Sequence, residues 1–380
     1  MPKIYLAVFK KKIEINHHLF YETSHSPSLV DIVGPEQLGD VVDFCFIENP
    51  YYPDEDLLKK LQEKLPVVIK SYPSSNPILA QKDLSAVVHV KPEFLILGNG
   101  ATELITIIQG LLVEDMGIPV PTFSEYIEKL QNMEKVKLFQ LPADKQYRLD
   151  LAAYADWLEA EKLSSALIIN PGNPTGQFIS REDLIAFLER MKKLKLVLLD
   201  ESFIDFAGEE IPSLMPFVEE FKNLVIVRSM SKHCGVPGLR LGYCCTANSH
   251  YLSKIRAALP VWNINTLAEY FLTQLKETDT VYHQARKRVI ADVRELYDNL
   301  SKLEGYEVYP SQSNFILIKI KHNLTAYELQ MRLLQEFGVY VRDCSNKVGL
   351  DNKHIRVASK GRDKDQLLVY ALRELANAIP

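Results

Sequence analysis

The sequence predicts an α/β fold, in which a large domain with a mostly parallel sheet, covered by helices on both faces, precedes a smaller α+β C-terminal domain. Three observations support this prediction. The 380 residues suffice for one large and one smaller domain, short apolar runs alternate with amphipathic stretches, and Gly, Asn or Asp follows the runs. Continuous apolar runs are typical of strands that are buried on both faces, as in a parallel sheet.

The predicted strands of the large domain are the apolar runs at 94–97, 167–169, 196–199 and 224–227. A helix is expected after Ser180, because Ser180 to Asp183 resembles a capping box and apolar residues follow at helical spacing. The adjacent Cys244 and Cys245 suit a strand that places one side chain on each face. The carboxyl ends of parallel strands meet at one edge of a sheet, so we expect the functional site there.

A long helix without Gly or Pro is predicted over 279–303, and strands are predicted at 315–320, 339–341 and 355–358. We therefore expect an N-terminal arm over 1–42, a large domain over 43–280 and a small domain over 281–380. Part of the arm is expected to pack on the small domain.

The composition disfavours several classes of function. A formal net charge of -5 argues against nucleic acid or an anionic membrane as a partner, and no stretch is apolar enough to span a bilayer. The five cysteines show no C-x-x-C spacing, so a cytoplasmic protein without disulfides is expected. The nine histidines form no pattern typical of a metal site.

The first motif is a strand, a glycine turn and a helix start, over 94–105. The unpaired N–H groups and positive dipole end of such a helix favour a bound phosphate, and Thr102 can add a hydroxyl. An ordinary turn into a helix is the alternative. Glu103 excludes both a P-loop and a dinucleotide-binding fingerprint.

Two further polar turns follow predicted strands. Residues 170–176 contain two prolines, two glycines and two asparagines, so this stiff turn is either a plain loop or a rigid support for the Asn173 amide. Asp200 comes directly after the apolar run at 196–199 and lies either at the solvent edge or buried beside a cation.

The richest motif, over 228–243, contains two serines, Lys232 and, eight residues later, Arg240. A nucleophilic lysine works best where nearby positive charge and desolvation lower its pKa, and Arg240 can supply that charge. The hydroxyls of Ser229 and Ser231 together with Arg240 can bind a phosphate dianion.

In their order and separation, these segments resemble the pyridoxal-phosphate (PLP)-dependent aminotransferase superfamily of fold type I, from about residue 43 to 375. The Asn-Pro-Thr-Gly turn and the Ser-x-Ser-Lys and Gly-x-Arg-x-Gly-Tyr sequences carry this resemblance. It implies that the large domain binds PLP.

The resemblance also implies roles for individual residues. Lys232 would bind PLP covalently and transfer protons, and Asp200 would pair with the pyridine nitrogen. Asn173 would hydrogen-bond the phenolic oxygen, and Phe123 would stack on the ring. The residues that would hold the phosphate are Ala101, Thr102, Ser229, Ser231 and Arg240, with Tyr72 reaching it from the neighbouring subunit of a homodimer.

Substrate-binding residues are expected at the N-terminal and C-terminal segments. Arg356 would bind the substrate carboxylate bidentately, although an arginine that solvates an exposed strand is the alternative. Paired with it, Arg342 could serve a phosphate. His25 either contacts a substrate phosphate or is a surface histidine. Asn49 lies in a Glu-Asn-Pro-Tyr segment that resembles histidinol-phosphate aminotransferases and is expected to contact substrate.

Three subgroups of the superfamily fit parts of the sequence. Besides the histidinol-phosphate aminotransferases, the segments at 200–206 and 341–346 resemble threonine-phosphate decarboxylase and related phospho-amino-acid enzymes. Phe203 stands where many aminotransferases carry a tyrosine that donates to the phenolic oxygen. The segments at 262–265 and 310–314 resemble aminotransferase-like proteins found alongside nucleotidyltransferases.

The main prediction is an aminotransferase that acts on a small, phosphorylated amine or amino acid, and the alternative is a phospho-amino-acid decarboxylase. The choice depends on which bond of the α-carbon lies perpendicular to the ring, and no motif encodes that angle. A PLP-binding transcription factor would need a DNA-binding domain, but residues 1–42 lack two helices and a basic face. A silent paralogue is not expected, because Lys232, Asp200 and Arg240 are all present.

Overall fold

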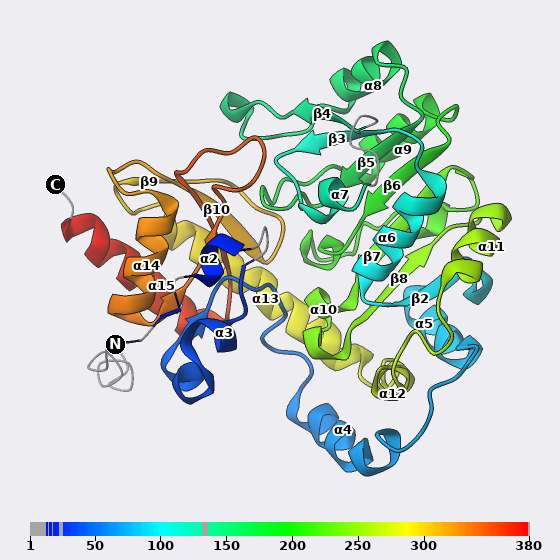
Figure 1. Cartoon of the computed structure of the whole chain (residues 1–380), viewed down its shortest axis with the longest axis horizontal. Helices are drawn as coiled ribbons and strands as arrows, with labels where there is room; N and C mark the ends of the chain where they lie inside the picture. Colours follow the sequence, from blue (N-terminus) through cyan, green and yellow to red (C-terminus); the bar gives the residue numbers. More distant parts are fainter. Residues whose placement is uncertain (1–12, 14, 17, 23–25, 131–135, 379–380) are drawn as a thin grey trace.

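The computed structural model describes residues 13, 15–16, 18–22, 26–130 and 136–378. It contains two main sheets, one on each side of a long helix (Figure 1). The larger sheet has seven strands in the order β2-β8-β7-β6-β5-β3-β4. Only β8 runs antiparallel to its neighbours, so the predicted mostly parallel sheet is confirmed. The strands are β2 (Leu95–Asn99), β3 (Met116–Val120), β4 (Val136–Gln140), β5 (Ser165–Ile169), β6 (Leu196–Asp200), β7 (Leu224–Ser229) and β8 (Leu241–Cys245).

Helices cover both faces of this sheet, and successive strand residues alternate between the two cores. Leu198 and Cys244 pack in the core beneath α6 (Ala101–Leu112) and α11 (Ser249–Ala258). Their neighbours Leu199 and Cys245 pack in the opposite core. The helices of that core are α4 (Glu55–Val68), α5 (Ile78–Val88), α8 (Leu151–Ala160), α9 (Arg181–Arg190) and α12 (Thr266–Gln274). The predicted placement of the two cysteines on opposite faces is therefore confirmed.

The predicted helix after Ser180 is confirmed as α9. The Ser180 hydroxyl accepts a hydrogen bond from the backbone N–H of Asp183 at 3.1 Å, which satisfies one of the free donors at the helix start. Leu184, Phe187 and Leu188 form the buried face, as their helical spacing predicted.

The smaller sheet is antiparallel, with four strands in the order β12-β13-β10-β9. These are β9 (Tyr306–Val308), β10 (Phe315–Ile320), β12 (Arg342–Asp343) and β13 (His354–Ala358), and α14 (Ala326–Phe337) and α15 (Arg362–Ala378) contribute to the same core. A separate parallel pair joins β1 (Val42–Asp43) to β11 (Val339–Tyr340), so the predicted strand at 339–341 pairs outside the main small sheet.

The long helix α13 (Asp279–Leu300), yellow in Figure 1, runs between the two sheets. It begins where the sequence predicts and ends three residues earlier than expected. Tyr282 packs in the core of the large sheet, whereas Val289 and Leu296 pack in the core of the small sheet. The domain boundaries at 42/43 and 280/281 stay a prediction.

Short helices make up the remaining elements. They are α2 (Leu19–Glu22), α3 (Leu29–Val33), α7 (Glu125–Glu128), α10 (Met230–His233) and the 3-10 turns η1 (Pro35–Asp40), η2 (Pro92–Phe94), η4 (Ala143–Lys145), η5 (Ile204–Phe206), η6 (Met215–Phe217) and η7 (Pro237–Leu239). Ile32 and Val33 of the N-terminal segment pack with Leu334 and Tyr340. None of the helices in the described ranges is long and apolar enough to cross a membrane.

Candidate active site

The carboxyl ends of β2, β3, β5, β6 and β7 surround a cavity of about 470 Å³. Residues from seven segments, most of them far apart in the chain, line it together. Those that the sequence analysis had singled out are Ala101, Thr102, Phe123, Asn173, Asp200, Ser229, Ser231, Lys232, Arg240, Arg342 and Arg356. The expected clustering of polar residues at this edge of the sheet is what the structure shows.

Lys232 lies on the single-turn helix α10, directly after β7. Burial and, to a smaller extent, the positive charge of Arg356 together lower the pKa of its amine to about 8. The backbone carbonyl of Lys232 accepts a hydrogen bond from the Asn49 N–H at 2.9 Å. At pH 7 roughly a tenth of an amine with this pKa is unprotonated and therefore nucleophilic.

Asp200 is the last residue of β6 and is only 5% exposed, so the buried alternative holds. Its carboxylate accepts hydrogen bonds from the Tyr126 hydroxyl and the Ser202 N–H, both at 2.8 Å. Burial raises the pKa of Asp200, and these donors and Lys232 oppose that rise. No ion pair joins Asp200 to any residue that the structure describes. A buried carboxylate without an ion pair needs a cationic partner to stay ionised, and a protonated pyridine nitrogen can be that partner.

A cradle for a phosphate lies at the N-terminus of α6. Gly100, at φ 77°, precedes the helix, and no side chain caps it. A Cβ on Gly100 would lie 2.4 Å from Nη2 of Arg240, and one on Gly242 would lie 2.4 Å from the Ala101 nitrogen. The two glycines therefore let β8 and the guanidinium approach the helix start. Arg240 Nη1 is 3.5 Å from the Ser231 hydroxyl, so N–H groups, a hydroxyl and a cation converge here.

The carboxylate of Glu103 is turned away from the first N–H groups of α6. It accepts hydrogen bonds from the Asn99 N–H at 2.7 Å and from the Asn263 amide at 3.2 Å. Its negative charge therefore anchors the glycine turn and does not occupy the cradle.

Arg356 lies on β13 of the small sheet, and its side chain lines the cavity. One nitrogen of its guanidinium donates to Asn173 Oδ1 at 2.8 Å, and the other donates to the Cys45 carbonyl at 2.8 Å. The alternative of a strand arginine solvated at the surface is therefore wrong. The Asn173 amide is held toward the cavity, which excludes the plain-loop alternative for its turn.

Two predicted residues lie outside the cavity of this chain. Tyr72 is 83% exposed, and its ring lies 5.0 Å from that of Trp262. The Asn49 amide donates to the His233 carbonyl at 3.1 Å and accepts from the Tyr51 N–H at 2.9 Å. Asn49 therefore supports the backbone around Lys232, and the predicted substrate contact is replaced by this role. His25 lies outside the described residues.

Two further residues of the site, Tyr126 and Lys347, were not predicted from the sequence. Lys347 lines the cavity, donates to the Ser124 hydroxyl and lies 6.0 Å from the ring centroid of Phe123. Burial lowers its pKa to about 8, with a further contribution from Arg342. A lysine five residues after Arg342 in a turn-rich segment was the available signal. Nearby, Ser26 accepts a hydrogen bond from Arg342 at 2.6 Å.

The fold and the site together define a PLP-dependent enzyme of fold type I. The residues present fit the cofactor: an amine of lowered pKa, a buried carboxylate that calls for a cation, and an uncapped helix start beside Arg240. When bound, PLP accepts the electron pair that remains when a bond to the α-carbon of a substrate breaks.

The chain belongs to the family described as aminotransferase class I and II, whose model matches residues 39–371. It is similar to a Sulfurospirillum multivorans protein named L-serine phosphate decarboxylase, with 34% identity over an alignment of 371 positions that covers 93% of this chain and 93% of that protein. The solved structure of a decarboxylase from that organism aligns with 94% of this chain over 94% of its own length, with a TM-score of 0.84 and 32% identity. Histidinol-phosphate aminotransferase from Clostridium acetobutylicum covers 89% of this chain and 100% of its own, with a TM-score of 0.82 at 27% identity.

Proposed function

We propose that this protein is a PLP-dependent decarboxylase of a phosphorylated amino acid, and that O-phospho-L-serine is its substrate. The observation that carries the proposal is the charge of the cavity: Arg342, Lys347 and Arg356 converge there in addition to the phosphate cradle for the cofactor. One carboxylate does not need three cations, whereas a carboxylate and a phosphate dianion do. The comparisons favour this alternative over the aminotransferase that was the main prediction.

The two anionic groups of the substrate are assigned by their distance from the α-carbon. The carboxylate is bonded directly to that carbon and must lie near Lys232. Arg356 is the cation with the largest effect on the pKa of Lys232, so we assign the carboxylate to it. Arg342, which donates to the Ser26 hydroxyl, and Lys347, which donates to the Ser124 hydroxyl, remain to bind the phosphate at the other end of the substrate.

In the proposed reaction the bond between the α-carbon and the carboxylate breaks, and carbon dioxide leaves. The α-carbon then takes a proton from the Lys232 ammonium, which gives O-phosphoethanolamine. With a pKa of about 8, this amine can both give up and take back a proton near neutral pH. The guanidinium of Arg356, held by Asn173 and Cys45, fixes the direction of the breaking bond.

The reaction is tested by incubating the holoenzyme separately with O-phospho-L-serine, O-phospho-L-threonine and histidinol phosphate. We expect carbon dioxide and O-phosphoethanolamine from the first substrate. Conversion of the cofactor to its pyridoxamine form, without release of carbon dioxide, would show an aminotransferase and contradict the proposal.

We also propose that the active enzyme is a homodimer in which Tyr72 contacts the phosphate of the neighbouring subunit. The exposed rings of Tyr72 and Trp262 form an apolar surface, and Ile69, Leu79 and Val261, close to them in the sequence, are also exposed. Such a surface favours association with a partner. It would place Tyr72, which does not reach the cavity of its own chain, where a second chain can use it.

Complementation between two inactive variants tests this arrangement. In a mixed dimer of Tyr72→Ala and Lys232→Ala chains, one site has both defects and the other has neither. We expect a refolded equimolar mixture to regain about a quarter of wild-type activity, because half of the dimers are mixed and each has one intact site. No regain, in a mixture shown to contain mixed dimers, would place Tyr72 outside the shared site.

A further inference from the structure

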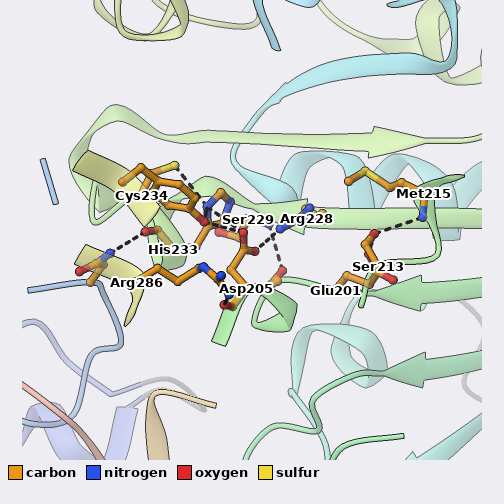
Figure 2. A network of polar contacts seen from close by, with 12 residues as sticks. Glu201, Asp205, Ser213, Met215, Arg228, Ser229, His233, Cys234 and Arg286 are labelled. Atoms are coloured by element: carbon orange, nitrogen blue, oxygen red, sulfur yellow. Dashed lines mark hydrogen bonds and ion pairs between the residues drawn. The ribbon is translucent and has the colours of Figure 1, made fainter. Parts of the chain in front are cut away.

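A buried polar network that includes His233, the residue after Lys232, is centred on Asp205, which is 2% exposed (Figure 2). Its carboxylate accepts hydrogen bonds from Arg228 and from the Tyr282 hydroxyl, and it lies 3.7 Å from Nδ1 of His233. The network therefore contacts the immediate neighbours of two cofactor residues. Arg228 directly precedes Ser229, and His233 directly follows Lys232.

The protonation states in this network follow from the direction of its hydrogen bonds. Because the Tyr282 hydroxyl donates to Asp205, its oxygen accepts from Nδ1 of His233 at 3.0 Å. Burial lowers the pKa of His233 to about 4, so the ring is neutral with its proton on Nδ1. Burial alone would raise the pKa of Asp205, but Arg228 and the other partners hold it below its usual value, and the carboxylate is ionised.

The network also connects the segment after β6 to helix α13. Arg286 of α13 donates to the Asp205 carbonyl at 2.9 Å and to the Gly208 carbonyl at 2.6 Å. The Ser229 N–H donates to the Ser202 hydroxyl at 3.0 Å, which joins the ends of β7 and β6 directly. The segments that carry Asp200 and Lys232 are therefore fastened to each other and to one rigid helix.

Helix α10, which carries Lys232, depends on such external contacts for its position. It has only four residues, and a single helical turn has no stability of its own. Among the contacts that hold it are the hydrogen bond between the His233 ring and Tyr282, the bond from the Asn49 side chain to the His233 carbonyl, and the bond from the Asn49 N–H to the Lys232 carbonyl.

We infer that Tyr282 and Asp205 are positioning residues, which fix α10 through His233 so that the Lys232 amine meets the cofactor between Asp200 and the phosphate cradle. The inference rests on the proposed role of Lys232 but not on the identity of the substrate. Removal of the Tyr282 hydroxyl is the most direct test of this inference, because the hydroxyl joins the neutral His233 ring to the Asp205 carboxylate and carries no charge itself. Removing it leaves the buried pair of Arg228 and Asp205 intact.

The experiment compares Tyr282→Phe with the matched control Tyr154→Phe. Tyr154 is also buried, and its hydroxyl donates to the Gly117 carbonyl at 2.6 Å, away from the cavity. Melting temperature, the rate of PLP release from the holoenzyme, kcat and KM are measured for both. We expect similar losses of melting temperature, but a roughly ten-fold faster PLP release only in Tyr282→Phe, the order expected for one hydrogen bond to a charged group.

Two further variants keep the inference testable if Tyr282→Phe does not fold. His233→Asn retains a donor near the position of Nδ1, and His233→Leu does not. We expect His233→Asn to release PLP at nearly the wild-type rate and to keep kcat, and His233→Leu to lose PLP faster and lower kcat with little change in KM. Wild-type PLP release and kcat in Tyr282→Phe, or in His233→Leu if Tyr282→Phe does not fold, would overturn the inference. PLP release does not depend on the substrate, so this result and the outcome of the substrate assay are independent.

Discussion

Lys232→Ala is expected to abolish both turnover and borohydride-fixable PLP. Lys232 lines the cavity directly after Ser231 of the phosphate cradle, and its lowered pKa suits covalent attachment. Because attachment and proton transfer are lost together, we expect kcat to fall by at least about 10⁴-fold. The measurement is the absorbance of bound cofactor before and after borohydride, followed by mass analysis of the denatured chain.

The matched control for this variant is Lys347→Ala. Lys347 is a second cavity lysine with the same lowered pKa of about 8. Its removal should leave borohydride fixation stoichiometric and weaken substrate binding. Stoichiometric fixation in Lys232→Ala, or its loss in Lys347→Ala, would move the attachment point from one lysine to the other.

Asp200→Ala is expected to retain PLP and lose most of its turnover. The phosphate cradle and Lys232 are untouched by this change, so the cofactor should still bind. The carboxylate that keeps the pyridine nitrogen protonated is lost, and with it the ability of the ring to accept electrons. We expect kcat to fall by about 10²- to 10³-fold, the range found when one preorganised electrostatic partner is removed.

Asp200→Asn sharpens this prediction, because it keeps the shape of the side chain and removes only the charge. The Ser202 N–H can still donate to the amide oxygen. Similar losses of kcat in both variants, with the bound cofactor present at full occupancy, are the expected result. Turnover within a few-fold of wild type in Asp200→Asn would place the partner of the ring nitrogen elsewhere.

Much of the fold was predictable because its signals are local. The apolar runs that became β5, β6 and β7 are continuous stretches, and the start of α9 is encoded by Ser180 and Asp183 within one turn. The same holds for the motifs at the strand ends. Once the strands are parallel, topology alone brings Asn173, Asp200 and Lys232 to one edge of the sheet.

The missed parts of the site depend on contacts between distant segments. The Tyr126 hydroxyl meets Asp200 from 74 residues away, and Lys347 meets Ser124 from 223 residues away. No local pattern encodes either pair. Asn49 was expected to contact substrate, but its amide binds the carbonyl of His233, 184 residues along the chain.

The type of reaction is harder still to predict than these contacts, because it depends on the orientation of a single bond of the substrate. In the proposed reaction, whether hydrogen or carboxylate leaves the α-carbon depends on the angle at which Arg356 would hold the substrate. The guanidinium is itself held by Asn173 and the Cys45 carbonyl, so three segments from different parts of the chain would together determine that angle. The sequence motifs of decarboxylases and aminotransferases are similar because they specify the cofactor site, which both reactions share.

The most direct test of the account is the fate of the carboxyl carbon of the substrate. The holoenzyme is supplied with O-phospho-L-serine labelled with ¹³C in its carboxylate, in buffer made with deuterium oxide. The account predicts one labelled carbon dioxide for each O-phosphoethanolamine, with a single deuterium delivered to the former α-carbon. Retention of the label in a 2-oxo acid, with the cofactor converted to its pyridoxamine form, would contradict it.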